Sequence, residues 1–179
     1  WGAGIFDGNI YVIDAVNKDS LRSVTNWLNI PQPGPHNTAL TSDGRFLFVT
    51  DEIGGNPRVL KVWDVDDVMN PVQVATWQPT GITTSIVHNV EIYGNRAVVA
   101  HYTSGVRVLD ITNPAAPLEI AWYDTFPSNN DFDFEGCWGV YMFPGGKIIA
   151  SDRQTGLYVL KMDSVLTGNN NNNHYIPKE

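Results

Sequence analysis

The sequence has little of what several classes of protein require. It contains one cysteine, Cys137, which excludes a disulfide within the chain. No stretch approaches the roughly 18 consecutive apolar residues of a membrane-spanning helix. The net charge is −8 and the 11 basic residues are scattered. Because binding to phosphates requires clustered lysine and arginine, this balance argues against a nucleic-acid partner.

Short catalytic motifs are also missing. The chain has no G-x-S-x-G nucleophile elbow, no H-E-x-x-H zinc motif and no glycine-rich phosphate loop. Nothing singles out two carboxylates for glycoside hydrolysis. A lone cysteine in an apolar, aromatic segment is expected to be an inert core residue. The sequence therefore favours a non-enzymatic protein over an enzyme.

An internal repeat is the strongest positive feature. Each copy has a basic residue, a short apolar strand, a polar turn with glycine and a second apolar strand. The copies are RFLFVTDEIGGNPRVLKVWDV (residues 45–65), RAVVAHYTSGVRVLDI (96–111) and KIIASDRQTGLYVLKM (147–162). They begin 51 residues apart, at positions 45, 96 and 147, which is a spacing typical of propeller blades.

Flanking segments complete the repeat unit. A further strand is predicted before each copy, at 36–44, 88–94 and 137–146, and Asp43-Gly44 and Gly145-Gly146 are typical hairpin turns. A fourth strand is predicted at 70–77 and 117–122. The fold class is therefore an all-β β-propeller with about three to four visible four-stranded blades, spanning residues 1–167. Residues 168–179 are predicted to be an asparagine-rich flexible tail.

The ends of the repeat predict an open arc. Residues 8–14 and 21–27 match a third and a fourth strand, whereas the last blade shows three strands. An open arc leaves strand edges that pair readily with other strands. We therefore expect the remainder of the same polypeptide, or another chain, to complete a larger ring. The start at Trp1, without a leader, favours a longer polypeptide, and an engineered or proteolysed fragment is the alternative.

Three histidines are candidate metal ligands. His36 and His88 precede the first strand of their blades, and His101 ends a second strand, as do Asp51-Glu52 and Asp152. Imidazole and carboxylate are the usual ligands of transition metals, so these side chains could converge on a cation at the funnel. The alternative, which the blade-to-blade spacing favours, is that each His-Asn pair caps a turn.

An acidic segment is the second candidate site. Alternation places Asp131, Asp133 and Glu135 on one face of an extended segment, and oxygen ligands suit Ca²⁺. The segment lacks the spacing of an EF-hand loop, and a solvated loop between blades is the favoured alternative. Asp64 matches Asp14 and Asp110, and a position present in every repeat is expected to hold a turn.

The repeats also carry a resemblance to a known family. The segments VRVLDITNPAAPLEIAWYDTFP (106–127) and HNVEIYGNRAVVAHYTSGVRVLDI (88–111), with LKVWDVDDVMNPVQVATW (60–77), resemble the LVIVD-repeat proteins, and most closely the choice-of-anchor B family. The resemblance implies a secreted or cell-surface bacterial propeller, often with a carboxyl-terminal anchor, and no reaction. It favours a non-enzymatic binding or assembly module without an assigned cofactor. The alternative is a metal-dependent enzyme with its site at the funnel.

Overall fold

The computed structural model describes residues 1–31, 33–162 and 174–175, which form four β-sheets and contain no helix. Blade 1 comprises β1 (Gly2–Gly4), β2 (Asn9–Asp14) and β3 (Arg22–Leu28), and blade 2 comprises β4 (Pro35–Leu40), β5 (Phe46–Asp51), β6 (Leu60–Asp64) and β7 (Val72–Trp77). Blade 3 comprises β8 (Asn89–Tyr93), β9 (Arg96–Ala100), β10 (Val106–Asp110) and β11 (Leu118–Tyr123), and blade 4 comprises β12 (Cys137–Met142), β13 (Lys147–Asp152) and β14 (Gly156–Lys161).

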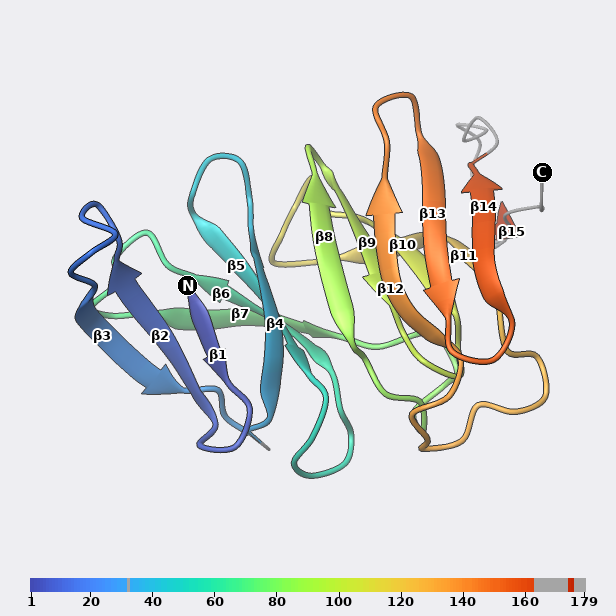
Figure 1. Cartoon of the computed structure of the whole chain (residues 1–179), viewed down its shortest axis with the longest axis horizontal. Coiled ribbons are helices and arrows are strands. Elements are labelled where there is room, and N and C mark those ends of the chain that lie inside the picture. The colour runs from blue at the N-terminus through green and yellow to red at the C-terminus, as the bar shows by residue number, and fades with distance from the viewer. Residues whose placement is uncertain (32, 163–173, 176–179) are drawn as a thin grey trace.

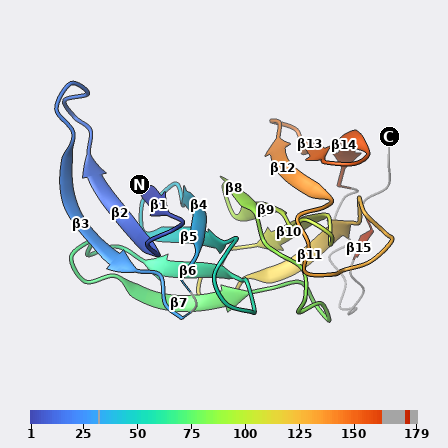
Figure 2. The ribbon, with the colours of Figure 1, turned by 60° about the horizontal axis from the view of Figure 1, so that its bottom comes forward.

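The blades follow one another along an open arc (Figures 1 and 2). The prediction of an all-β propeller is confirmed, and the described residues form a partial propeller. Within them, no helix has the length and apolar character that a membrane span requires.

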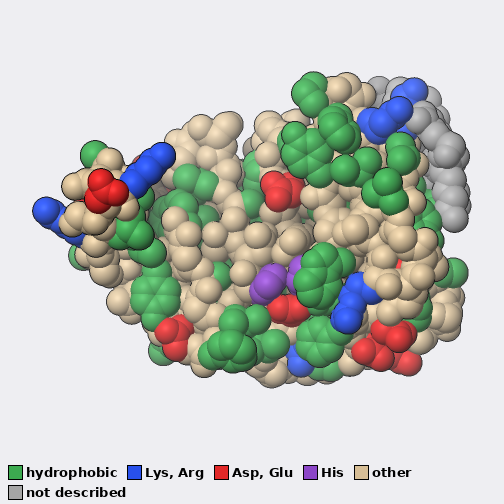
Figure 3. Space-filling view, viewed as in Figure 1, with side chains coloured by type: hydrophobic (Ala, Val, Ile, Leu, Met, Phe, Trp, Pro, Cys, Tyr) green, Lys and Arg blue, Asp and Glu red, His purple; other side chains and the backbone are tan. Residues whose placement is uncertain are grey.

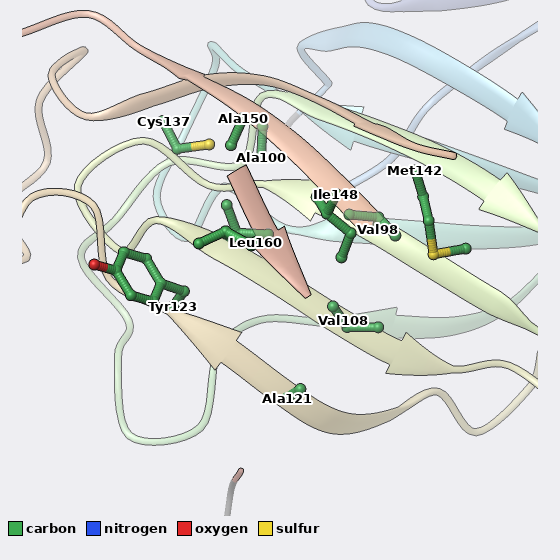
Figure 4. Close-up of a cluster of buried hydrophobic side chains, with 11 residues drawn as sticks. Val98, Ala100, Val108, Ala121, Tyr123, Cys137, Met142, Ile148, Ala150 and Leu160 are labelled. Carbon is green, nitrogen blue, oxygen red and sulfur yellow. The ribbon is translucent and has the colours of Figure 1, made fainter. Parts of the chain in front are cut away.

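The core lies between the blades and is divided into three apolar clusters. Because side chains alternate across a strand, β5 sends Leu47 and Val49 toward blade 1 and Phe48 toward blade 3. In β9, Ala97 and Val99 likewise face blade 2. The opposite face of blade 3, with Val98 and Ala100, packs on blade 4 (Figure 4). Cys137 is fully buried in this last cluster, as predicted. Stacking of blades thus buries strands that are apolar on both faces.

The repeat is visible in individual hydrogen bonds. The carboxylates of Asp14, Asp64 and Asp110 each accept a hydrogen bond from the backbone N–H two residues later, at 2.9, 3.1 and 2.8 Å. The prediction that this position holds a turn is confirmed. In all three blades the ladder between the two outer strands is also shifted just before this position, as in a β-bulge.

Two strands were not predicted. The short β1 pairs with β2, so blade 1 has three strands instead of the predicted two; Gly2-Ala3-Gly4 carries no apolar alternation that would signal a strand. β15 (His174–Tyr175) lies parallel to β11 at the outer edge of blade 3. The rest of the predicted tail, residues 168–173 and 176–179, lies outside the described residues.

Candidate metal centre

Strand register places His36, His88 and Trp138 at one equivalent position in three successive blades. In each blade the next residue along the chain belongs to the first strand and pairs with the second strand. These pairs are Asn37↔Thr50, Asn89↔Ala100 and Gly139↔Ser151. Two residues after each second-strand partner come Glu52, Tyr102 and Arg153, at a second equivalent position. Because blades stack side by side, the residues at these two positions meet.

These residues form one cluster at the end of the strands. The imidazole rings of His36 and His88 stack with centroids 4.5 Å apart, and the His88 ring lies 4.3 Å from that of Trp138. His36 Nδ1 lies 3.1 Å from Glu52 Oε2, and His88 Nε2 lies 3.6 Å from Glu52 Oε1. Within the described residues, His36, Glu52 and His88 are the one group of three histidine, cysteine or acidic residues whose ligand atoms all lie within 4.8 Å.

The tautomer of His88 follows from its neighbours. Its Nδ1 contacts the backbone carbonyl of Trp138, which can only accept a hydrogen bond, so Nδ1 carries the proton. Nε2 therefore holds a lone pair, which is buried, faces Glu52 and has no hydrogen-bond partner among the residues that the structure describes. Burial lowers the pKa of His88, so its ring is neutral. A neutral imidazole fixed through its other nitrogen has the form of a metal ligand.

Glu52 is held on several sides. The backbone N–H of Glu52 donates to the carbonyl of Gly34 at 2.9 Å, and its backbone carbonyl accepts from Arg58 Nη1 at 2.7 Å. The Tyr102 hydroxyl donates to Oε1. Burial and the adjacent Glu52 raise the pKa of Tyr102, so the phenol keeps its proton and remains a donor. Tyr102 adopts φ +27°, a conformation that few residues other than glycine adopt.

Two imidazoles and one carboxylate are a suitable donor set for a divalent transition metal. Three protein ligands of this kind leave further coordination positions for water or a ligand. His36 provides access, because 32% of its side chain is exposed whereas His88 is almost wholly buried. Figure 3 shows histidine side chains at the surface beside acidic, basic and hydrophobic ones. The unpartnered Nε2 of His88 could bind such an ion, and the hydrogen bond from Tyr102 would orient Glu52 toward it.

His101 does not join this cluster. Its Nδ1 lies 3.0 Å from the hydroxyls of both Ser85 and Ser104. Its ring is nearly perpendicular to that of Trp77, with 6.0 Å between the ring centroids. Burial, with a smaller contribution from Arg107, lowers the pKa of His101 to about 3. His101 is therefore a neutral residue of the interior and not a third imidazole of the site. Asp152 is also separate and accepts hydrogen bonds from the N–H groups of Gln154 and Thr155.

The acidic segment does not form a compact oxygen cage. The ligand atoms of Asp131, Asp133 and Glu135 are not grouped within 4.8 Å in the described part of the chain. Asp131 and Asp133 are exposed, and the segment is tied to blade 3 through backbone carbonyls that accept from Thr84 and Thr103. This geometry is that of a loop between blades.

The turn-cap interpretation of the His-Asn pairs is wrong for two of their side chains. Asn37 Oδ1 accepts from the N–H of Val90 at 3.0 Å, and His88 bonds to Trp138. Both hydrogen bonds join neighbouring blades instead of closing a turn. Trp138 lies at the rim of the cluster, and 43% of it is exposed.

Comparisons with known proteins agree with this fold. Residues 86–125 match the model of the LVIVD repeat. No curated protein matches the chain. The fold resembles a protein from Lactobacillus plantarum with a TM-score of 0.69 and 13% identity, over 88% of this chain and 46% of that one. It also resembles the periplasmic gluconolactonase of Pseudomonas aeruginosa with a TM-score of 0.64 and 18% identity, over 89% and 45%.

A functionally unknown protein from Desulfotomaculum acetoxidans gives a TM-score of 0.64 at 11% identity, over 98% of this chain and 50% of that one. The chain thus spans about half the length of the solved structures that it matches. At these identities the likeness shows the fold alone. The repeat match and the fold together support a repeat protein of the β-propeller type.

Proposed function

We propose that this chain is a binding module of an exported β-propeller protein and that His36, Glu52 and His88 bind a divalent transition metal in it. The LVIVD match and the periplasmic location of one protein with this fold support export. The resemblance to the choice-of-anchor B family favours a place at the cell surface. Further polypeptide, from the same or another chain, completes the ring.

The observation that carries the metal proposal is the buried lone pair of His88. A polar atom buried without a partner lowers stability by about 1–3 kcal/mol, so it calls for an explanation. Nε2 of His88 lies opposite a carboxylate and beside a second imidazole, in a group held by Trp138 and Tyr102. A metal ion would satisfy this lone pair and both neighbours at once.

The donor set selects among metals. Calcium takes six to eight oxygen ligands, whereas this cluster offers two nitrogens and one carboxylate. Zinc and the later first-row transition metals favour imidazole with carboxylate. We therefore expect zinc, or a metal of similar preference, and not calcium.

A metal-dependent hydrolase is the second candidate function. It is favoured by the three-ligand set, because catalytic zinc sites keep a coordination position open for water or substrate. Tyr102 adds a protonated hydroxyl next to Glu52. Lactone hydrolysis is the form of this candidate that the name of the Pseudomonas aeruginosa protein suggests.

Metal analysis of the purified chain tests the proposal. After exposure to zinc and dialysis, we expect about one zinc per chain in the wild type and none in His88→Asn, which keeps a hydrogen-bonding side chain but removes the imidazole. Asp133→Asn is the matched control, since it removes a carboxylate from the exposed loop, and it should keep the zinc. Zinc retained by His88→Asn and lost from Asp133→Asn would place the metal elsewhere.

Completion of the ring is tested separately by sedimentation and thermal unfolding. The proposal requires a blade edge to pair with further polypeptide. A folded, monodisperse monomer of this chain that remains stable with both end blades uncovered would contradict it.

A further inference from the structure

Two guanidinium groups lie beside the cluster of His36, Glu52 and His88. The Arg58 guanidinium lies 3.9 Å from the ring centre of Phe132, and its Nη1 donates to the carbonyl of Glu52. The Arg153 guanidinium lies 5.3 Å from the ring centre of Trp138, and its Nη1 donates to the carbonyl of Phe134. Arg58 also lies 5.5 Å from the ring centre of Phe134. Each cation is therefore fixed by one hydrogen bond and by aromatic rings, which leaves its other N–H groups for a ligand.

One of these donors is already shielded from water. Arg58 Nε is buried and has no hydrogen-bond partner in the part of the chain that the structure describes. Burial lowers the pKa of Arg58, while the charge of Glu52 opposes that effect. An unpartnered guanidinium donor next to the proposed metal site can bind an oxygen acceptor.

Exposed aromatic side chains surround the same place. Trp138, Phe132 and Phe134 are 43%, 39% and 38% exposed. The Phe134 and Trp138 rings both contact Tyr102, at 5.4 and 6.0 Å between centroids. The aromatic surface is thus continuous with the residues that hold Glu52, and it offers apolar contact to a ring-bearing ligand.

The balance of charge at the cluster favours an anion. A bound divalent metal and two guanidiniums outweigh the single carboxylate of Glu52. Arg153 and Arg58 both lower the pKa of Tyr102, and Arg153 also lowers that of His88, although burial dominates both pKa values. The carboxylates of Asp131, Asp133 and Glu135 lie on the neighbouring loop and weaken this positive field.

We infer that this site binds a small organic oxyanion that carries an apolar ring. A carboxylate or phosphate oxygen coordinates the metal and contacts Arg58 and Arg153, and the ring of the ligand packs on Trp138 and Phe132. The inference rests on the proposed function, because it assigns the ligand of the same metal site. Oxygen ligands and bidentate guanidinium contacts are the shared chemistry of both anions.

Calorimetric titration of the zinc-loaded chain with four probes tests the inference. Benzoate and phenyl phosphate carry the ring and the charge, benzamide has the shape of benzoate without its charge, and acetate has the charge without the ring. We expect benzoate or phenyl phosphate to bind at least about tenfold more tightly than benzamide and acetate. The tighter of the two shows whether carboxylate or phosphate is preferred.

Variants assign the binding to the two arginines. Arg153→Gln should weaken the tighter probe about tenfold with zinc content unchanged, and Arg58→Gln should weaken it by a similar factor. Arg22→Gln removes an equal charge from the exposed strand β3 and should leave the affinity unchanged. Equal affinity for benzoate and benzamide, or no effect of either arginine, would overturn the inference while the metal site stands.

The metal-free chain separates the two proposals. If zinc does not bind at all, the proposed function fails, and the same probes are titrated without metal. Weaker binding that still depends on Arg58 and Arg153 would support the anion site on its own. Absence of binding in that titration would overturn it as well.

Discussion

Asp51 and Glu52 are consecutive residues at the end of β5, and both carboxylates are buried, yet their surroundings differ. Asp51 forms an ion pair with Lys61 at 2.8 Å and accepts from Asn29 Nδ2 at 2.6 Å and from the N–H of Gly34 at 3.3 Å. Glu52 has two imidazoles and a phenol around it and no buried lysine. Adjacent side chains at a strand end point to opposite sides, so Asp51 enters the interior and Glu52 meets His36 and His88.

The difference separates a structural carboxylate from the one that we propose to bind a metal. Around Asp51 the charge is matched: Oδ2 accepts no hydrogen bond within the described residues but forms the ion pair with Lys61. Lys61 also donates to the carbonyls of Asn29 and Pro31, and Trp63 Nε1 donates to Asn29 Oδ1. This network ties blade 1 to blade 2. Around Glu52 one buried nitrogen has no partner within the described residues. The Asp51 network holds the two blades together, whereas the unpartnered nitrogen beside Glu52 is the basis of the proposed metal site.

The largest expected effect is on the Asp51 side of the comparison. Lys61→Met leaves a buried carboxylate without its cation and should lower the free energy of unfolding by about 3–5 kcal/mol. Urea unfolding at pH 7.5 measures it. Arg45→Met breaks the exposed Arg45–Asp64 pair and should change stability little, because solvent screens that pair. Equal effects of the two variants would remove the distinction between the pairs.

The pH dependence of stability should carry the signature of Asp51. Burial raises the pKa of Asp51 from 3.8 to about 6, against the opposing charge of Lys61. Between these values the folded state keeps a proton that the unfolded chain has lost, so the contribution of this carboxyl falls as pH rises through the window. The stability of wild type relative to Asp51→Asn should therefore fall by roughly 3 kcal/mol from pH 4 to pH 7.

Urea unfolding of both proteins across that range measures the difference. A difference that rises with pH would mean that Lys61 outweighs burial and lowers the pKa of Asp51.

Gly34 contacts both residues, since its N–H donates to the carboxylate of Asp51 and its carbonyl accepts from the backbone N–H of Glu52. A Cβ at this position would lie 1.8 Å from the carbonyl oxygen of Ile53, so the backbone must shift. Gly34→Ala should destabilise by roughly 2 kcal/mol. Gly2→Ala, whose Cβ would meet Tyr11 at an ordinary 3.7 Å, serves as the control in thermal unfolding. An unchanged Tm for Gly34→Ala would contradict the close approach.

The smallest expected effect is on the Glu52 side. Tyr102→Phe removes the hydroxyl that donates to Glu52 Oε1 while the ring packing remains. Loss of an outer hydrogen bond to a metal ligand lowers metal affinity by about 10- to 100-fold, and we expect the lower end because His36 and His88 stay in place. Competition with a chromogenic zinc chelator measures the change. Unaltered zinc affinity would mean that Tyr102 only fills space.

The fold could be predicted from the sequence because the repeat is a local pattern. Glycine turns and alternating strands recur with it, and Gly105 and Gly156, the turn glycines of the second and third copies, adopt φ of +78° and +91°. Strand β1 escaped prediction because its glycines give no pattern. The periodic features thus identify blades, and they fail where a strand has no side-chain alternation.

The site could be predicted only in part. His36 and His88 were named from their shared position in the repeat, and Glu52 from the end of a strand. His101 was grouped with them because it also ends a strand. Its separation from the cluster depends on contacts with Ser85 and Trp77, which the sequence does not reveal. Tyr102 and Arg153 align with Glu52 in the repeat, yet their roles depend on contacts between blades. Alignment of the repeats was the signal that could have found them.

The central claim is that His36, Glu52 and His88 hold one transition metal. X-ray absorption at the zinc edge of the zinc-loaded chain tests it most directly, together with the spectrum of His88→Asn. The predicted result is nitrogen and oxygen ligands at about 2.0–2.1 Å with scattering from two imidazoles, and a loss of imidazole scattering in the variant. A spectrum without imidazole ligands, or one that His88→Asn leaves unchanged, would contradict the claim.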